Sequence, residues 1–322
     1  MARQCTKVSR YPHTLLSIMK WILREGIDFQ PEGPNSRGST FTQLFQVIPA
    51  IEPFYMEWEK KYDSSPVYEW MKSVPWVPIA GVILYVVGIF GGQALMKNRK
   101  PFDLKWPLAY WNLALSLFSI MGMVRVVPHL IYLTATKGLG VVACGAPEPL
   151  YGNAAVGFWV QAFILSKLAE LIDTAFIVLR KKPLQFLHWY HHVTVLLFTW
   201  FCYTHENPGI IFVAMNYSVH AIMYGYYFLM AVRVRPSWLK PQFITLMQIS
   251  QMVVGVATAA FYIMKIRAGE ECAVDQDLLV ACGVMYSTYL YLFCEFAVRR
   301  FILGPKKETA PGKAGVSKMK AQ

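Results

Sequence analysis

Residues 186–204 read FLHWYHHVTVLLFTWFCYT, a long apolar run with three histidines near its start. A helix of roughly 20 apolar residues crosses the hydrocarbon core of a bilayer, so this run predicts a transmembrane helix. His188, His191 and His192 stand at i, i+3 and i+4, and on a helix their imidazoles share one stripe. Ionisable groups inside a membrane are costly and usually mark functional sites. The segment therefore predicts a membrane helix that carries chemistry.

The composition of the whole chain also indicates a membrane protein. Of its 322 residues, 55% are hydrophobic and only 16% are charged, and the mean hydropathy is +0.35. A soluble domain has about 25% charged residues. The net charge of +12 would also suit a nucleic-acid binder, but long apolar runs separate the charges, which excludes nucleic acid as a partner.

Seven stretches are long and apolar enough to cross a bilayer. They are Trp76 to Met96, Trp106 to Ala135, Ala154 to Leu179, Phe186 to Thr204, Gly209 to Val232, Gln242 to Ile266 and Leu278 to Ile302. The predicted fold is an all-α integral membrane protein with seven transmembrane helices.

Loop charges predict how the helices are oriented. Basic residues gather in alternate loops, after the first, third, fifth and seventh spans. Basic loops stay on the cytosolic side, so the N-terminus is expected in the lumen and the C-terminus in the cytosol. Residues 1–53 form an N-terminal extension with a predicted interfacial helix around Leu15 to Leu23. Residues 54–302 form the seven-helix domain and 303–322 a basic cytosolic tail.

Two chemistries could use the histidine stripe. Membrane di-iron oxygenases and desaturases carry H-x-x-H-H boxes, but two irons need about eight histidine ligands. This chain has seven histidines, and those outside the stripe are isolated. The alternative is acyl transfer, in which a neutral imidazole attacks a thioester without a metal. A non-catalytic receptor or transporter with seven helices stays open as a third hypothesis.

The third predicted span carries a line of charged residues. Lys167, Glu170 and Asp173 share one helix face. Together with Arg125 of the second span, they can neutralise one another and line a polar cavity. A salt-bridge network that only holds helices together is the structural alternative.

Polar residues recur in the fifth and sixth spans as well. Asn216, His220 and Tyr224 follow one another at single-turn spacing in the fifth span. Gln248 and Gln251 stand three residues apart in the sixth, where interhelical hydrogen bonding explains them as readily as function does. We expect the fifth-span residues to complete a composite site with the histidine stripe.

Four motifs occur in one order along the chain. They are Lys167-x-x-Glu170-x-x-Asp173-Thr174, His188-x-x-His191-His192, Met215-Asn216-x-x-x-His220-x-x-Met223-Tyr224 and Thr245-x-x-Gln248-x-x-Gln251. They resemble the signature regions of the ELO-type fatty acid elongases, over roughly Phe54 to Ile302. The resemblance implies a 3-oxoacyl-CoA synthase of the endoplasmic reticulum membrane, which condenses acyl-CoA with malonyl-CoA and releases carbon dioxide and CoA. It also implies seven transmembrane helices, the last six closing around a tunnel for the acyl chain.

The resemblance assigns roles to individual residues. It makes His191 the nucleophile that carries the acyl group as an acyl-imidazole. The resemblance also gives four candidates for stabilising the developing oxyanions, which are His188, His192, Asn216 and His220. The substrate-binding and CoA-binding set is Lys167, Glu170, Asp173, Arg125, Arg180, Lys181, Lys182, Tyr224, Gln248 and Gln251.

The resemblance also implies partners and a subclass. No metal or other cofactor is expected beyond the substrates acyl-CoA and malonyl-CoA. Partners are the lipid bilayer and the ketoacyl-CoA reductase, dehydratase and enoyl-CoA reductase of the elongation cycle, and a homodimer is allowed. Pro183 stands where elongases of polyunsaturated chains tend to carry glutamine, so the chain resembles the branch that acts on saturated and monounsaturated substrates. Cys144 and Cys272 look like a family pair that can form a luminal disulfide.

Overall fold

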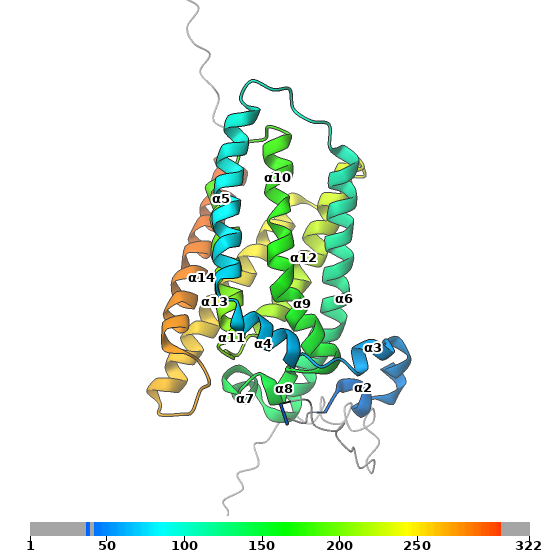
Figure 1. Ribbon diagram of the computed structural model, residues 1–322, viewed down its shortest axis with the longest axis vertical. Helices are drawn as coiled ribbons and strands as arrows, with labels where there is room; N and C mark the ends of the chain where they lie inside the picture. Colours follow the sequence, from blue (N-terminus) through cyan, green and yellow to red (C-terminus); the bar gives the residue numbers. More distant parts are fainter. Residues whose placement is uncertain (1–36, 39–41, 304–322) are drawn as a thin grey trace, which may run out of the picture.

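The computed structural model describes residues 37–38 and 42–303, and in this part of the chain it contains helices and no strands. The interfacial helix predicted around Leu15 to Leu23 and the basic tail lie outside the described residues. Four short helices come first: α2 (Leu44–Val47), η1 (Pro49–Phe54), α3 (Glu57–Lys60) and α4 (Ser65–Ser73). They lie at the lower end of the molecule in Figure 1.

Long helices make up most of the described chain. They are α5 (Trp76–Met96), α6 (Lys105–Lys137), α9 (Ala154–Glu170), α10 (Ile172–Leu179), α11 (Phe186–Thr204), α12 (Ile210–Ala231), α13 (Pro241–Arg267) and α14 (Gln276–Ala297). Two short helices, α7 (Leu139–Cys144) and α8 (Glu148–Tyr151), connect α6 to α9, and a π-helical turn, η2 (Val298–Ile302), follows α14. Their bounds agree closely with the predicted spans.

Four helical segments are long and apolar enough to cross a membrane. These are Trp76–Met96, Lys105–Lys137, Pro241–Arg267 and Gln276–Ile302. The helices that carry the charged and histidine motifs, α9 to α12, are not among them. α9 has 17 residues and α10 has 8, so each is too short by itself, and polar side chains lower the hydropathy of α11 and α12.

The third predicted span is correct in its limits but is not one continuous helix. It is divided at Leu171 into α9 and α10. There, the Thr174 amide donates to the Leu171 carbonyl three residues back, at 3.3 Å. A tight turn of this kind inside a helix often marks a functional position. It lies between Glu170 and Asp173, whose side chains both reach the cavity described below.

Six of the long helices contact one another in a closed circuit. α6 packs against α12, α12 against α13, α13 against α14, α14 against α11, α11 against α9, and α9 against α6. α5 lies outside this circuit, against α10 and α11. Figure 1 shows these helices running along the long axis of the molecule. Polar side chains on their inner faces therefore share one interior.

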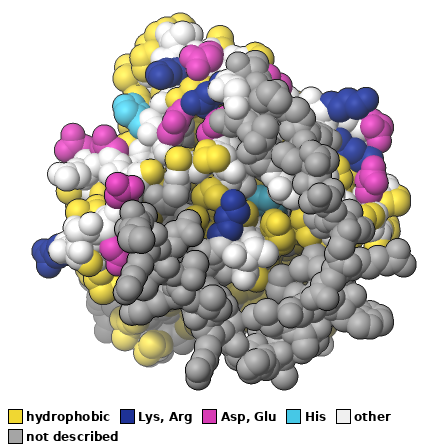
Figure 2. Space-filling model, turned by 90° about the horizontal axis from the view of Figure 1, so that it is seen from below, with side chains coloured by type: hydrophobic (Ala, Val, Ile, Leu, Met, Phe, Trp, Pro, Cys, Tyr) yellow, Lys and Arg dark blue, Asp and Glu magenta, His cyan; other side chains and the backbone are white. Residues whose placement is uncertain are grey.

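The two ends of the molecule carry different charges. The loops after α5, α10 and α12 lie at the upper end in Figure 1 and are basic. Their positive residues are Lys97, Arg99, Lys100, Arg180, Lys181, Lys182, Arg233, Arg235 and Lys240. The opposite end, seen in Figure 2, shows acidic side chains as well as basic and hydrophobic ones. This difference is the one on which the predicted orientation depends.

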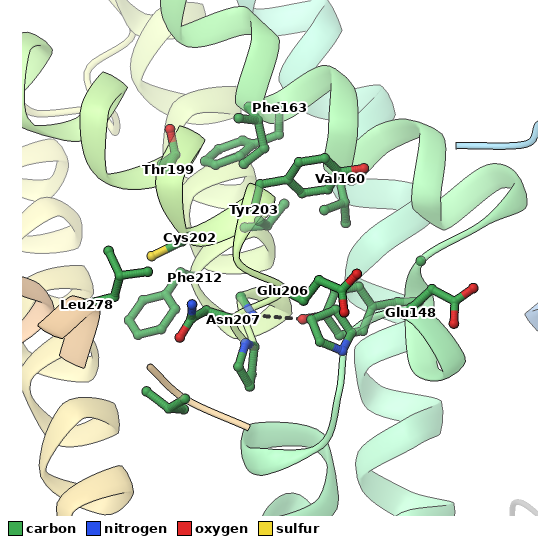
Figure 3. A pocket seen from close by; sticks show the side chains of 18 of the residues that line it. Glu148, Val160, Phe163, Thr199, Cys202, Tyr203, Glu206, Asn207, Phe212 and Leu278 are labelled. Atoms are coloured by element: carbon green, nitrogen blue, oxygen red, sulfur yellow. Dashed lines mark hydrogen bonds between the residues drawn. The ribbon is translucent and has the colours of Figure 1, made fainter. Parts of the chain in front are cut away.

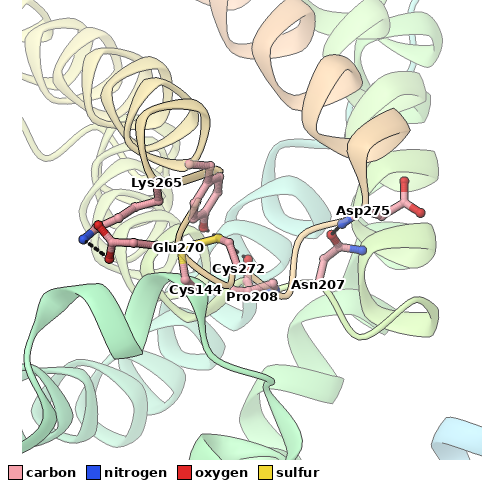
Figure 4. The surroundings of a disulfide bond; sticks show 8 residues. Cys144, Asn207, Pro208, Lys265, Glu270, Cys272 and Asp275 are labelled. Atoms are coloured by element: carbon pink, nitrogen blue, oxygen red, sulfur yellow. Dashed lines mark hydrogen bonds and ion pairs between the residues drawn. A yellow bond between two sulfur atoms is a disulfide. The ribbon is translucent and has the colours of Figure 1, made fainter. Parts of the chain in front are cut away.

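A disulfide ties the loops at the lower end together. Cys144, the last residue of α7, is bonded to Cys272 in the loop between α13 and α14 (Figure 4). The Ala273 amide donates to the Cys144 carbonyl at 2.7 Å, and the Asp275 amide donates to the Asn207 side-chain oxygen at 2.8 Å. The cysteine pair suggested by the resemblance is thus bonded in the structure.

Removing this disulfide is expected to lower stability without removing activity. The bond joins residues 128 positions apart, and such a link stabilises a protein by about 2–4 kcal/mol. Thermal unfolding of the purified protein in detergent should show a lower midpoint for the double variant Cys144→Ser/Cys272→Ser. Cys294→Ser, which changes an exposed free cysteine, is the control and should melt like the wild type. Equal midpoints for all three proteins under non-reducing conditions would contradict this expectation.

Candidate active site

A cavity of about 860 Å³ lies within the circuit of helices and opens toward the basic end. We call it the histidine cavity, because His188, His191 and His192 of α11 line it. It brings together most of the predicted site: His188, His191, His192, Asn216, His220, Glu170, Asp173, Arg180, Tyr224, Gln248 and Gln251. Residues of α6 and α14, which carry none of the four motifs, complete its walls.

The histidine stripe is held by contacts within α11 and by two hydroxyl groups. The ring of His192 lies 4.6 Å from that of His188 and 5.5 Å from that of His191, between centroids. Outside α11, Nε2 of His188 forms a hydrogen bond with the Thr174 hydroxyl of α10 at 2.9 Å. That hydroxyl also bonds to the Tyr85 hydroxyl at 2.8 Å. The orientation of the His188 ring is therefore fixed by α5 and α10.

Two rings of the stripe, those of His192 and His191, form no hydrogen bond within the described part of the chain, and His191 is the less buried of the two. Its ring nitrogens have no hydrogen-bond partner within the described part of the chain, and its side chain faces the histidine cavity. The Tyr289 ring packs against it with a centroid distance of 5.1 Å. The Tyr289 hydroxyl donates to the His191 carbonyl at 3.3 Å and also bonds to Thr194. α14 thus supports the backbone and ring of His191 and leaves its nitrogens unoccupied.

A buried lysine orients the polar group on α12. Nζ of Lys167 donates to Glu170 Oε1 at 2.7 Å and to Asn216 Oδ1 at 3.3 Å. Lysine can only donate, so the oxygen of the Asn216 amide must face it, and the NH₂ group is left to face His220 Nε2 at 3.3 Å. Ser166 donates to the same Glu170 oxygen at 3.0 Å. Lys167 itself is buried and does not line the cavity, so it contacts Asn216 from behind the cavity wall.

Asp173 anchors the other side of the cavity. Its two carboxylate oxygens accept hydrogen bonds from the Tyr224 hydroxyl, at 2.7 Å, and from Nε1 of Trp111, at 2.5 Å. These contacts join α10 to α12 and α6. Gln248 and Gln251 of α13 complete this wall, and Gln248 also contacts the Met223 sulfur at 3.2 Å.

The prediction that Arg125 helps to neutralise the charges of α9 is wrong. Arg125 instead forms a buried ion pair with Glu59 of α3, with 3.0 Å between Nη2 and Oε2. It also donates to the Phe54 carbonyl at 2.6 Å, and its guanidinium lies 4.2 Å above the Tyr55 ring centroid. Trp159 donates to the same carboxylate at 2.7 Å. The side chain points from α6 toward the N-terminal short helices and away from the histidine cavity.

The basic residues of the loops divide into two groups. Lys181 does not line the cavity, because its ammonium donates to the carbonyls of Lys97 and Arg99, at 3.0 Å each, and ties two loops together. Lys182 is exposed and also lies outside the lining. Those at the cavity mouth are Lys105, Arg180, Arg233 and Arg235. Of the three predicted CoA-binding residues, only Arg180 is therefore placed at the mouth.

Comparison with known proteins identifies the family of this chain. The model of the GNS1/SUR4 family, ELO, matches residues 70–309. The chain belongs to the ELO family. Very long chain fatty acid elongase 6 of Gallus gallus is 41% identical over 247 residues, which cover 76% of this chain and 92% of that relative. Very long chain fatty acid elongase 3 of Homo sapiens is 42% identical over 264 residues, which cover 81% of this chain and 92% of that relative.

The resemblance inferred from the four motifs is confirmed, since all four lie within the residues that match the ELO family. The sequence alone does not show that several supporting residues belong to the site. Trp111, Tyr85 and Ser166 are single polar-tipped residues in apolar stretches, and no spacing distinguishes them. Arg233 and Arg235 are visible as a basic loop, but only the fold places them at the cavity mouth.

Proposed function

We propose that the chain joins a saturated or monounsaturated long-chain acyl-CoA to malonyl-CoA through an acyl group carried on His191. Its family and relatives make it a fatty acid elongase, an acyltransferase of the 3-oxoacyl-CoA synthase type. The observation that carries the mechanism is the His191 ring, which has no hydrogen bond to the described residues and faces a cavity shared with Asn216 and His220. A neutral imidazole nitrogen in this setting is a competent nucleophile toward a thioester.

The first step is transfer of the acyl group. A ring nitrogen of His191 attacks the thioester carbonyl, a carbon–nitrogen bond forms, and the carbon–sulfur bond breaks. The proton displaced from the imidazole leaves with the sulfur, so CoA departs as a thiol. His188 and His192, whose rings pack in the same stripe, supply neighbouring nitrogens that can pass this proton.

The second step forms the new carbon–carbon bond. Malonyl-CoA loses carbon dioxide, and the electron pair of the broken bond becomes an enolate. The enolate carbon attacks the acyl carbonyl on His191, and the carbon–nitrogen bond then breaks, so the electron pair returns to the ring, which takes up one proton from solvent. The product is a 3-oxoacyl-CoA that is longer by two carbons, and His191 is restored for the next cycle.

Both steps pass through negatively charged oxygens that need hydrogen-bond donors. The amide of Asn216 is held with its NH₂ group away from Lys167, on the side of His220. Fixed donors of this kind lower the barrier because they need no reorganisation during the reaction. We assign Asn216 and His220 to this role and Lys167 to their positioning.

We further propose that α9–α10, α11 and α12 cross the membrane with the four more apolar segments, so that seven spans enclose the acyl chain. Their motifs face the shared interior, where polar residues do not contact lipid. The basic end then faces the cytosol and the disulfide end the lumen of the endoplasmic reticulum. The product must next be reduced and dehydrated, so we expect it to pass to a ketoacyl-CoA reductase, a dehydratase and an enoyl-CoA reductase. A homodimer is compatible with this arrangement.

Charge reversal at the cavity mouth is expected to weaken CoA binding. Arg233 and Arg235 are exposed and line the mouth, where they can bind the phosphates of CoA. The variant Arg233→Glu/Arg235→Glu should raise KM for malonyl-CoA about tenfold or more, with less effect on kcat, because charge-assisted hydrogen bonds contribute roughly 1.5–3 kcal/mol each. Steady-state kinetics at low and moderate salt measure this. Lys182→Glu, in a neighbouring loop outside the mouth, is the matched control, and an equal effect there would contradict the assignment.

The proposed reaction is tested by release of carbon dioxide from malonyl-CoA labelled in its free carboxyl group. Release should require a long-chain acyl-CoA and should match the 3-oxoacyl-CoA formed. We propose that no metal takes part, whereas the alternative, a metal-dependent fatty acyl oxygenase, requires bound iron and loses activity with chelators. Metal analysis of the active protein separates the two. An iron-dependent, malonyl-CoA-independent reaction would overturn the proposal.

A further inference from the structure

A row of three side chains connects the histidine cavity to α5, which lies outside the circuit of helices. Nε2 of His188 lies 2.9 Å from the Thr174 hydroxyl, and the Tyr85 hydroxyl lies 2.8 Å from the same Thr174 oxygen. We call these three residues the hydroxyl chain. Thr174 is fully buried and Tyr85 is only 6% exposed, so these hydrogen bonds are shielded from water.

The backbone brings α5 close enough to α10 for this contact. Tyr85, Ile89 and Met96 are buried and lie on one face of α5. Gly92 lies on the same face, where a Cβ atom would be 3.1 Å from Cγ1 of Val178 in α10. A larger side chain there would push the two helices apart. The tight packing of α5 against α10 therefore places the Tyr85 hydroxyl at Thr174.

The Thr174 hydroxyl is available because it makes no bond to its own backbone within the described part of the chain. A threonine in a helix often donates to the carbonyl four residues back. Thr199 of α11 does so, with 2.8 Å to the Val195 carbonyl, and Figure 3 shows it beside a second cavity. Thr174, by contrast, comes three residues after the turn at Leu171, in the first turn of α10. Its single proton can therefore be donated to a side chain.

The protons of the hydroxyl chain can be placed by counting donors. Each hydroxyl carries one proton, and the Tyr85 hydroxyl bonds only to Thr174 among the described residues. If Tyr85 donates to Thr174, and Thr174 donates to Nε2 of His188, both protons are used. The other arrangements leave one hydroxyl proton buried without an acceptor, which is unfavourable. Nε2 of the neutral His188 ring is therefore the acceptor, and the ring carries its proton on Nδ1.

Nδ1 of His188 is the nitrogen of this ring that a substrate can reach. It has no hydrogen-bond partner among the described residues, and it is not fully buried, unlike Nδ1 of His192. The ring lines the histidine cavity together with Asn216 and His220. A proton on Nδ1 thus makes His188 a hydrogen-bond donor toward bound substrates.

We propose that Thr174 and Tyr85 are positioning residues that hold His188 in the Nδ1-protonated form, so that it donates a hydrogen bond to the oxygen that becomes negative during condensation. This inference rests on the proposed function, because it takes the histidine cavity as the place where the thioester carbonyls react. His188 then acts as a fixed donor beside Asn216 and His220. Through Tyr85, α5 takes part in the active site although it carries none of the four motifs.

The protonation of the His188 ring tests this directly. ¹⁵N NMR of protein labelled in its histidine rings separates protonated from unprotonated ring nitrogens, and the signals missing from His188→Gln belong to His188. At a pH where the imidazole is neutral, we expect a protonated Nδ1 and an unprotonated Nε2. Thr174→Val, which removes the hydroxyl but keeps the branched shape, should release the ring into a mixture of both forms. Thr199→Val is the matched control, because its hydroxyl bonds only to backbone carbonyls, and it should leave the His188 signals unchanged.

Steady-state kinetics provide a second measurement. Thr174→Val should lower kcat about tenfold or more with KM for malonyl-CoA within about twofold, since loss of one fixed donor lowers kcat roughly a hundredfold and the released ring still adopts the donor form part of the time. Thr174→Ser retains a hydroxyl and should restore most of kcat. Tyr85→Phe keeps the ring and does not depend on Thr174→Val folding. It should lower kcat by about twofold to tenfold, the effect of one hydrogen bond.

A protonated Nε2 in the wild type would overturn the inference, as would wild-type kcat in both Thr174→Val and Tyr85→Phe. A Thr174→Ser variant as slow as Thr174→Val would also overturn it, because the packing of Thr174 and not its hydroxyl would then matter. Failure of the proposed function would look different, because the wild type itself would then release no carbon dioxide from malonyl-CoA with any acyl-CoA, whichever nitrogen of His188 is protonated.

Discussion

Replacement of His191 by alanine is expected to reduce condensation by at least about a thousandfold, because loss of a catalytic nucleophile removes the covalent route. In the variant, carbon dioxide release from malonyl-CoA should no longer depend on acyl-CoA. The fold should remain, since the His191 ring makes no hydrogen bond to the described residues and its contacts are those with the Tyr289 and His192 rings. The measurement is the rate of acyl-CoA-dependent carbon dioxide release by purified protein.

The control for this variant is the histidine that caps the opposite end of the same helix, away from the histidine cavity. His205 follows α11 at its other end, where Nδ1 contacts the Phe201 carbonyl at 2.9 Å. His205→Ala should retain most of the activity. If His191→Ala kept more than about a tenth of the wild-type rate, His191 would not be the nucleophile. Similar losses in both variants would indicate a general defect of α11.

Replacement of Lys167 by methionine is expected to destabilise the protein by about 3–5 kcal/mol, because it leaves a buried carboxylate without its partner. Lys167 and Glu170 have side chains only 2% and 4% exposed. Glu170 Oε2 already has no hydrogen-bond partner in the described structure. The variant should also lose activity, because the amide of Asn216 is no longer oriented. Thermal or denaturant unfolding in detergent measures the first effect, and condensation assays measure the second.

A double variant separates stability from catalysis. Lys167→Met/Glu170→Leu removes both charges, and replacing a buried ion pair by apolar groups is often neutral for stability. We expect the double variant to recover much of the lost stability but not the activity. A double variant less stable than Lys167→Met, or a single variant as stable as the wild type, would contradict this role of the pair.

Much of the fold could be predicted from the sequence, because each membrane helix requires a long apolar run of its own. The bounds of α5, α11 and α13 follow directly from such runs. The shared cavity was also predictable in outline. His191 and Asn216 occur on separate apolar helices, and polar residues in such helices avoid lipid by facing a common interior.

Other features depend on partners that are distant in the sequence. Arg125 was assigned to the charged group of α9 because Glu59 lies in a polar N-terminal segment that gave no sign of packing against α6. The turn at Leu171 depends on backbone hydrogen bonds and leaves no sign in an otherwise helical pattern. Lys181 was assigned to CoA by its charge, whereas its contacts with backbone carbonyls appear only in the fold.

The acyl group on His191 is the central claim, and intact-protein mass spectrometry tests it most directly. The purified protein is exposed to palmitoyl-CoA without malonyl-CoA, and the adduct is located by peptide mapping. We expect one palmitoyl group on His191, which disappears when malonyl-CoA is added and which His191→Ala does not acquire. An adduct that persists unchanged in His191→Ala, or an active wild-type protein that forms no adduct under these conditions, would contradict it.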